Sequence, residues 1–372
     1  MTADPIVYRI AFASLKGINR VLASEILGRV GSERDFFAAS ESALASVMGV
    51  RSKIFDRAYR DSLLEKAAKE ADFIAAHSIT PLYYADEAYP ARLADCEDAP
   101  LMLYGTGSCD LNRGATIGIV GTRHATPYGI DFTERLVEGL AASLAEPPVI
   151  VSGLAFGIDI AAHRAALKHG LPTVAVLAHG LNIIYPAQHR QTAVNIVKSN
   201  GMLLTEFTSS DPVHKGNFVA RNRIVAGLCD CLVVPESATK GGALITAGLA
   251  AEYNRDVFAL PGRISDKYSA GCNRLIASNS AGLICGADDL IDAMGLQRKP
   301  QEATQPSLFV ELSPEEQAVI NYITEKGEAR VNQLSIALDI SVGKLMALLI
   351  DMEFKGLLLA YPGAKYRLAQ TQ

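Results

Sequence analysis

The 372-residue sequence lacks the features that would assign it to several large protein classes. It has no excess of positive charge, because 35 Lys and Arg stand against 40 Asp and Glu for a net charge of −5. A protein that coats duplex DNA through its overall field is therefore excluded. No stretch approaches the ~18 uninterrupted apolar residues of a membrane span. The N-terminus, MTADPIVYRIAFASL, also lacks the basic start and apolar core of a signal peptide. We expect a cytoplasmic protein without membrane contact.

Metal and disulfide motifs are also missing. The six cysteines contain no CxxC pair and no histidine at zinc spacing, so we expect reduced thiols in the core. Six of the seven histidines lie between residues 124 and 214, but none forms an HExxH pair and no carboxylates cluster with them. A metal centre is a minor alternative, and we predict neither a metal nor another cofactor.

The sequence contains no nucleotide fingerprint of the GxGxxG or GxxxxGK(S/T) type, and no GxSxG nucleophile elbow. Ser152 has no assignable His–Asp relay. Asp159 and Glu206 each follow an apolar run, which leaves an acid–base pair open. The alternative for Asp159 is that it tethers the start of a helix. We predict a binding protein rather than an enzyme.

Residues 81–295, with a core at 105–290, alternate short apolar runs with stretches long enough for a helix. Near-continuous apolar strands separated by helices indicate a parallel sheet covered on both faces. The predicted fold class is α/β, an extended Rossmann-like doubly wound sheet, with ligands beyond the carboxyl ends of the strands. The predicted strands are Thr116–Val120, Val149–Val151, Thr173–Leu177, Met202–Leu204, Cys231–Val234, Val257–Leu260 and Gly282–Ile284.

Residues 1–80 read as a helical domain with two similar turns, around Gly17 and Gly49. An apolar-x-Gly-apolar turn between short helices is typical of a helix-hairpin-helix (SAM-like) domain, whose backbone N–H groups hold a DNA phosphate. A plain helical bundle with glycine turns is the alternative, and we favour it because 12 basic residues are outnumbered by 15 acidic ones through residue 104.

The polar stretch 296–311 predicts a linker, and residues 312–372 a winged helix. Ser313 and Pro314 predict a helix start, and the segments around Tyr361-Pro362-Gly363 predict a hairpin. The third helix, Ser341–Lys355, offers few side chains that read bases, so we favour a protein-interaction or spacer role over DNA reading.

Glycine-containing loops follow three of the predicted strands, at Gly121-Thr122-Arg123, Ser152-Gly153 and Lys240-Gly241-Gly242. Such loops at helix starts let the backbone approach an anion, and together they predict a broad phosphate-binding rim. The stretch KGNFVARNR adds three cations and Phe218 without an acidic residue. Cations with an aromatic face suit single-stranded nucleic acid.

The strings IVGTRHATPYG, VSGLAFGIDIAAHRAAL, FVARNRIVAGL and KGGALITAGLAAEYNRDVFALPG resemble the DNA-processing protein DprA (Smf) family across the central domain. The resemblance implies a homodimer that binds single-stranded DNA without base specificity, protects it, and loads the RecA recombinase during natural transformation. It also implies that Arg123 and Lys215 hold phosphates, that Phe218 stacks on a base, and that Asn222 and Lys240 add contacts. The complete set of expected DNA-binding residues is Gly121, Thr122, Arg123, Ser152, Gly153, Lys215, Phe218, Arg221, Asn222, Arg223, Lys240, Gly241 and Gly242.

Two small-molecule alternatives remain at this point. LOG phosphoribohydrolases share this kind of domain but carry PGGxGTxxE, and the glutamate is missing from the corresponding KGGALITAG here. A nucleotide-binding module without turnover is the other alternative.

Overall fold

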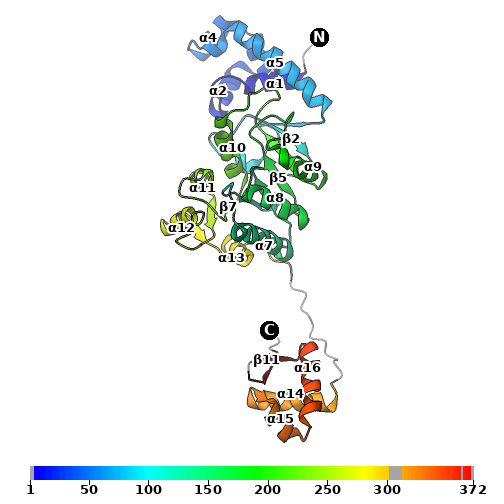
Figure 1. The fold of residues 1–372 in the computed structure, drawn as a ribbon. Coiled ribbons are helices and arrows are strands. Elements are labelled where there is room, and N and C mark those ends of the chain that lie inside the picture. Colours follow the sequence, from blue (N-terminus) through cyan, green and yellow to red (C-terminus); the bar gives the residue numbers. More distant parts are fainter. Residues whose placement is uncertain (1–3, 301–311, 362, 370–372) are drawn as a thin grey trace. The chain divides into compact units, whose positions relative to one another are not determined.

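The computed structural model describes residues 4–300, 312–361 and 363–369. The chain divides into two compact units, Met1–Lys299 and Pro300–Gln372 (Figure 1). Most of the stretch predicted as a linker, residues 301–311, lies outside the described residues. Just before it, the backbone of Lys299 donates to the Ser143 carbonyl at 2.7 Å, so this part of the chain is held against the larger unit.

The larger unit is built on a nine-stranded sheet in the order β1-β2-β6-β5-β4-β3-β7-β8-β9. The seven neighbouring strands β6-β5-β4-β3-β7-β8-β9 run parallel to one another, and each coincides with a predicted apolar run. This confirms the prediction of a largely parallel, Rossmann-like sheet. These strands are β3 (Thr116–Ile119), β4 (Val149–Ser152), β5 (Thr173–Val176), β6 (Met202–Thr205), β7 (Cys231–Val234), β8 (Asp256–Ala259) and β9 (Gly282–Leu283).

Two strands at one edge were not predicted. β1 (Thr80–Tyr83) pairs antiparallel with β2 (Met102–Gly107), which pairs antiparallel with β6. β1 contains Pro81 and β2 contains two glycines, and these residues weaken a strand pattern. Proline is tolerated in β1 because this strand lies at the edge of the sheet.

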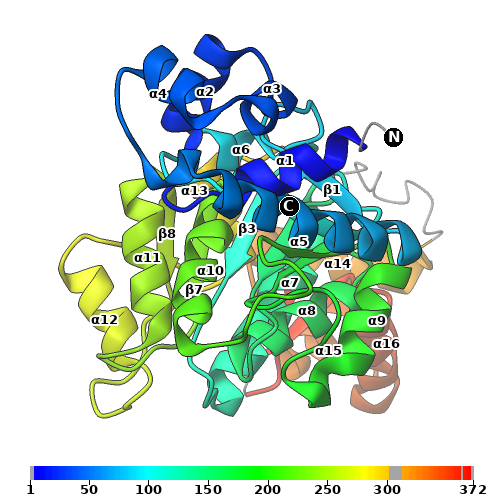
Figure 2. The same ribbon diagram turned by 90° about the horizontal axis from the view of Figure 1, so that it is seen from above.

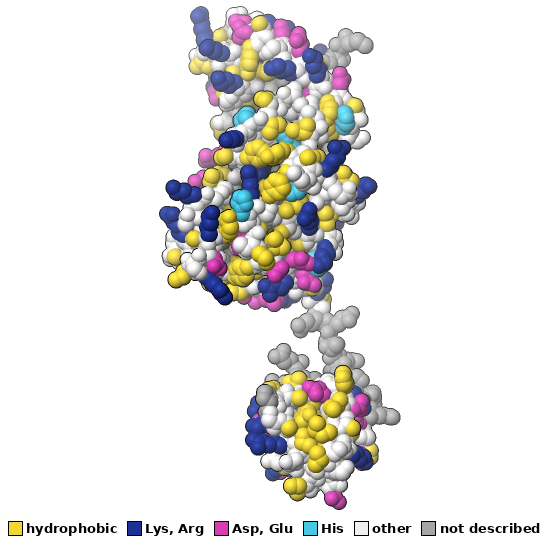
Figure 3. Space-filling view, in the orientation of Figure 1, with side chains coloured by type: hydrophobic (Ala, Val, Ile, Leu, Met, Phe, Trp, Pro, Cys, Tyr) yellow, Lys and Arg dark blue, Asp and Glu magenta, His cyan; other side chains and the backbone are white. Residues whose placement is uncertain are grey.

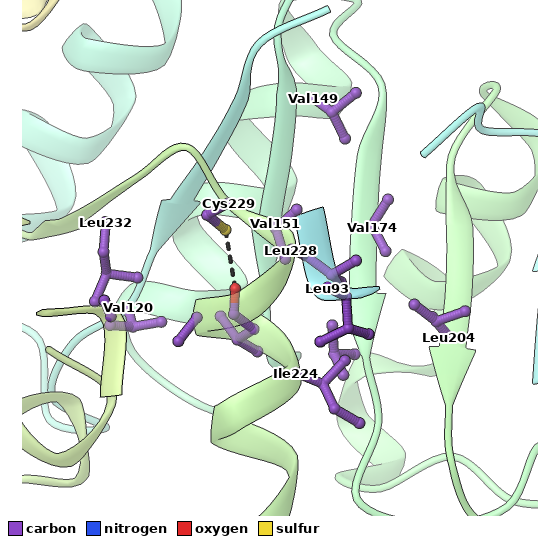
Figure 4. Close-up of a cluster of buried hydrophobic side chains, with 14 of the residues drawn as sticks. Leu93, Val120, Val149, Val151, Val174, Leu204, Ile224, Leu228, Cys229 and Leu232 are labelled. Carbon is purple, nitrogen blue, oxygen red and sulfur yellow. Dashed lines mark hydrogen bonds between the residues drawn. The ribbon is translucent and has the colours of Figure 1, made fainter. Parts of the chain in front are cut away.

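Helices cover both faces of the sheet, and alternate strand residues enter the two cores. Val151 packs with Ile224 and Leu228 on one face (Figure 4), whereas Ile150 packs on the other face. This alternation is the period-two pattern of a strand buried on both sides. The first face is covered by α6 (Ala91–Ala94), α10 (Lys215–Leu228), α11 (Gly242–Glu252) and α12 (Ala270–Ala277), and the second by α7 (Pro127–Ser143), α8 (Ile158–Lys168), α9 (Arg190–Lys198) and α13 (Ala287–Met294) (Figure 2).

The N-terminal helices pack on the β1–β2 edge, where Tyr83 and Tyr104 enter their core. The two predicted glycine turns are present, with Gly17 and Gly49 at φ of 77° and 70°. The carboxylate of Glu70 accepts from the Ser209 N–H at 2.9 Å and so holds the segment that leads to α10. The elements are α1 (Pro5–Ala13), α2 (Arg20–Val30), α3 (Glu33–Ala38), α4 (Glu41–Met48), the short 3₁₀ helix η1 (Lys53–Phe55) and α5 (Arg57–Ala76).

The smaller unit contains three helices and a three-stranded antiparallel sheet in the order β10-β12-β11. Ser313 begins its first helix with a capping box, in which its side chain and that of Glu316 each accept a backbone N–H of the other residue. The elements are α14 (Pro314–Lys326), β10 (Ala329–Arg330), α15 (Val331–Leu338), α16 (Val342–Phe354), β11 (Leu358–Tyr361) and β12 (Lys365–Leu368).

Within the described residues, no single helix is both long and apolar enough to cross a bilayer; α15 and α16 reach that length and composition only together, across a bend of 113°. All six cysteines are free thiols. Five of them are buried, and Cys285 is exposed.

Candidate nucleic-acid interface

A cavity of about 470 Å³ opens at the carboxyl edge of the sheet, beside β3 and β7. The chain leaves β3 through α7 toward β4 and leaves β7 through α11 toward β8, on opposite sides. Such a switch point is where open α/β sheets bind ligands. Nine of the predicted residues line this cavity: Gly121, Thr122, Arg123, Phe218, Arg221, Asn222, Lys240, Gly241 and Gly242.

The basic stretch KGNFVARNR forms the first part of α10 rather than a loop. Its N-terminus is capped by His214, whose ring accepts from the Gly216 N–H at 3.1 Å. The helix brings Phe218 to the cavity, where the Arg123 guanidinium lies 5.8 Å from the ring centroid. Tyr185 packs edge-on against the same ring, at 5.7 Å between centroids. The cavity therefore presents an aromatic ring beside an exposed cation. Figure 3 shows how charged and hydrophobic side chains are distributed over one face of the molecule.

Two of the three helix starts that we expected to bind anions are occupied by the protein's own carboxylates. At α7, buried Glu236 accepts from the N–H and hydroxyl of Thr126, at 2.8 and 2.5 Å. At α8, buried Asp159 accepts from the Gly153 and Ala155 N–H groups, at 3.1 and 3.4 Å. A carboxylate at a helix N-terminus satisfies the same groups that would hold a phosphate. These two helix starts are therefore not open to an anion as the predicted rim requires, although Gly121, Thr122 and Arg123 of the first loop line the cavity.

The third helix start is open. Gly241 caps α11, and among the described residues no side chain accepts from the N–H groups at this end as a cap. A methyl group built on Gly242 would meet nothing within 4 Å, so a ligand can approach the backbone closely. The exposed Lys240 precedes this start, and Arg123 lines the same cavity. Open helix N–H groups beside an exposed cation are the kind of groups that bind a phosphate at a helix N-terminus.

Arg221 forms the buried floor of the cavity, with 5% of its surface exposed. Its Nη1 donates to the Val176 carbonyl at 3.1 Å, and its Nε has no partner among the described residues. Burial lowers the pKa of Arg221, and the charge of Asp159 opposes this shift. Burial likewise raises the pKa of Asp159, against the charge of Arg221 and the bonds from backbone N–H groups. The floor therefore holds a buried guanidinium and a buried carboxyl group that oppose each other's pKa shift, and the Nε donor of Arg221 is unused.

Gly153 lies beneath this floor instead of lining the rim. A methyl group built on Gly153 would fall 1.2 Å from Arg221 Nη1, so the guanidinium fits only because this residue has no side chain. Ser152 is fully buried and its hydroxyl donates to the Ile119 carbonyl at 2.6 Å. Neither residue is available to a ligand, and the sequence prediction for this pair is corrected accordingly.

Two predicted cations do not line the cavity. Arg223 forms an ion pair with Glu206 and donates to the Asp98 carbonyl at 2.8 Å, in a separate cavity beside the N-terminal helices. It is therefore a structural residue here, and its assignment to the site is corrected. Lys215 is exposed at the first position of α10, outside the residues that line the cavity.

The acid–base pair left open by the sequence is not assembled. Asp159 lines the cavity at β3 and β7, whereas Glu206 lines the separate cavity with Arg223. Burial raises the pKa of Glu206, and the Arg223 ion pair opposes the rise. Each carboxylate therefore has a structural role in a different place.

Sequence reasoning missed Lys267 and Tyr268, which complete the far wall of the cavity. Lys267 lies 5.4 Å above the Tyr268 ring, which stacks on His124 at 6.2 Å. A signal was present, because these residues follow β8, the strand next to β7, at the same carboxyl edge as the other loops.

The fold and cavity define a Rossmann-like protein that combines cations, an aromatic ring and an open helix start at the switch point of its sheet. The model of the DNA recombination-mediator protein A family matches residues 80–295, and the chain belongs to this family.

Similar proteins agree with this assignment. Protein Smf of Synechocystis sp. is 30% identical over 405 residues, covering 97% of this chain and 98% of its own. The crystal structure of DNA processing protein A from Streptococcus pneumoniae superposes with a TM-score of 0.61 at 30% identity, covering 78% of this chain and 98% of its own. The same protein from Helicobacter pylori, whose structure is described for its single-stranded DNA binding mode, superposes at 0.51 and 31% identity, covering 58% and 95%.

Proposed function

We propose that this protein binds single-stranded DNA without base preference in the cavity between β3 and β7. The observation that carries the proposal is the pairing of the Phe218 ring with the Arg123 guanidinium, beside the open N-terminus of α11. An aromatic face stacks on any unpaired base, and cations with helix N–H groups neutralise phosphates without reading sequence.

The described contacts suggest a division of roles. Phe218 stacks on a base, Asn222 donates or accepts at its edge, and Arg123 and Lys240 hold phosphates at the start of α11. Arg221 and Asp159 form the charged floor beneath these groups. Lys215, exposed at the N-terminus of the same helix, holds a phosphate outside the cavity.

Family membership extends the proposal to the cell. We infer that the protein acts as a homodimer in the cytoplasm, protects incoming DNA and loads the RecA recombinase during natural transformation or recombination. We also infer that the N-terminal helices form a helical domain whose two glycine turns resemble those of a helix-hairpin-helix, and that the smaller unit is a winged helix. The helix order α14, α15 and α16 followed by the β11–β12 hairpin supports the latter.

We infer binding without catalysis. Asp159 and Glu206 lie in separate cavities, and Ser152 is buried against the Ile119 carbonyl. The glutamate of the phosphoribohydrolase motif is missing from the KGGALITAG segment, so the LOG-like alternative is not favoured.

The test is the binding of labelled oligo-dT and of duplex DNA across a salt series. We expect preference for the single strand, and a salt slope that falls by about 0.7 in Arg123→Ala, the share of one phosphate on a single strand. Phe218→Leu keeps bulk but loses the ring, and should cost roughly 1–3 kcal/mol of affinity. Arg135→Ala, an exposed cation on α7 outside the cavity, is the matched control.

Two results would refute this function. Equal affinity for single strand and duplex, with slopes unchanged in Arg123→Ala, would exclude the proposed site. Weak DNA binding together with tight binding of a mononucleotide would assign the cavity to a small nucleotide.

A further inference from the structure

A second cavity of about 670 Å³ lies between α7 and α8 and shares Arg123 and His124 with the first. Its size lies within the ~300–1,000 Å³ range of small-molecule sites, enough to receive a nucleotide. Because the two cavities share Arg123 and His124 as a wall, a nucleic-acid strand held at Phe218 would reach the second cavity by passing Arg123.

The aromatic element of this cavity is Phe156, a residue that is 42% exposed. Its ring contacts His189 edge-on at 4.8 Å between centroids, which fixes its orientation and leaves part of its surface open. The backbone below is held tightly, because a methyl group on Gly157 would fall 2.1 Å from the Thr122 carbonyl. The Phe156 loop therefore rests directly on the turn that carries Arg123.

The charge of this cavity also suits a phosphate. Arg164 is exposed on its α8 wall and makes no hydrogen bond or ion pair with the described residues. Lys168, one turn further along α8, forms an ion pair with Glu134, so the carboxylate in the cavity is already neutralised. Arg123 and Arg164 are then the two cations of this cavity that have no ion-pair partner among the described residues.

We propose that the cavity between α7 and α8 is a second nucleotide subsite for the same single strand, with Phe156 as its stacking surface and Arg164 as its phosphate contact. The inference rests on the proposed function. The second subsite also gives the bound strand a direction. The strand runs from the start of α11 across Arg123 toward the C-terminal half of α8. Apolar walls at Ile130 and Ile160 favour a base over a free inorganic anion.

The experiment compares a short oligo-dT of about 4 nucleotides with one of about 12, a span typical of single-strand sites. The observable is the ratio of the two affinities, because only the longer strand reaches both cavities. We expect Phe156→Leu to reduce this ratio about 5- to 150-fold, the range expected for one stacked base. Arg164→Ala should reduce the salt slope of the longer oligomer by about 0.7 and leave that of the shorter one unchanged.

Two further variants sharpen the test. Glu134→Gln frees Lys168 and should raise the affinity ratio, an effect that loss of structure would not produce. Arg135→Ala removes a cation from the same helix outside the cavity and should leave the ratio unchanged.

The failure of this inference differs from that of the proposed function. If the wild-type protein binds neither oligomer, single-strand binding itself is refuted. If it binds both and the ratio is unchanged in Phe156→Leu and Arg164→Ala, the second subsite is refuted. A loss of self-association in those variants would then assign the cavity to a protein contact.

Discussion

Substitution of Gly153 by alanine tests whether the buried guanidinium under the cavity is correctly placed. The new methyl group would lie 1.2 Å from Arg221 Nη1, so Arg221 has to leave its position. It then loses the 3.1 Å bond to the Val176 carbonyl, and Asp159 loses the nearby cation that opposes its burial. A hydrogen bond to a charged group contributes about 1.5–3 kcal/mol, and the uncompensated buried carboxyl adds to the cost.

We therefore expect Gly153→Ala to lower the free energy of unfolding by at least about 2 kcal/mol. At about 2–4 °C per kcal/mol, the melting temperature should fall by at least roughly 4–8 °C. Gly242→Ala is the matched control, because its methyl group would meet nothing within 4 Å. It should leave the melting temperature unchanged while weakening DNA binding at the start of α11. Equal melting temperatures for the two variants would show that Arg221 does not lie over Gly153.

Three further predictions concern the charges of the two units. Burial lowers the pKa of His163 to about 3, so as the pH falls the unfolded state binds a proton at a higher pH than the folded state does. The free energy of unfolding measured in urea should therefore drop by about 2 kcal/mol from pH 7 to pH 5. His163→Asn should remove most of this drop. Arg223→Ala should lower the free energy of unfolding by about 1–3 kcal/mol, because it leaves the largely buried Glu206 carboxylate without its cation. Single-strand affinity should persist, and a selective loss of affinity would return Arg223 to the site. Two cations on β12 lower the pKa of Glu328 to about 2. The stability that these ion pairs contribute is lost as the pH falls from about 4.5 toward 2. Hydrogen exchange of β12 in the intact chain should therefore accelerate over this pH range, but not in Glu328→Gln.

The sheet was predictable because parallel strands buried on both faces leave nearly continuous apolar runs, and the runs at Val149–Val151 and Cys231–Val234 became β4 and β7. β2 was not predictable in this way. Its segment MLYGTG carries glycines that weaken the strand pattern, and it forms a strand because β6 and β1 lie beside it. A partner supplied by the tertiary structure leaves no local signal.

The site shows a different limit, which concerns what occupies a glycine-rich loop. All three loops were predicted at the ligand edge, and all three lie there. At α8 the carboxylate is Asp159 of the helix itself, as the alternative reading of that residue allowed. At α7 it comes from elsewhere, because Glu236 follows β7 yet binds Thr126. Its distance along the chain from Thr126 hides the pairing from any local pattern.

The separation of Arg221 from Arg223, by contrast, follows from helix geometry alone. Residues two apart on an α-helix point about 200° away from each other, whereas residues three and four apart share a face. Phe218, Arg221, Asn222 and Val225 follow the spacing i, i+3, i+4 and i+7, and all four line the cavity. Arg223 falls on the opposite side and binds Glu206. Treating KGNFVARNR as a helix would have placed the two arginines on different faces of it. The different outcomes expected for Gly153→Ala and Arg223→Ala depend on that distinction.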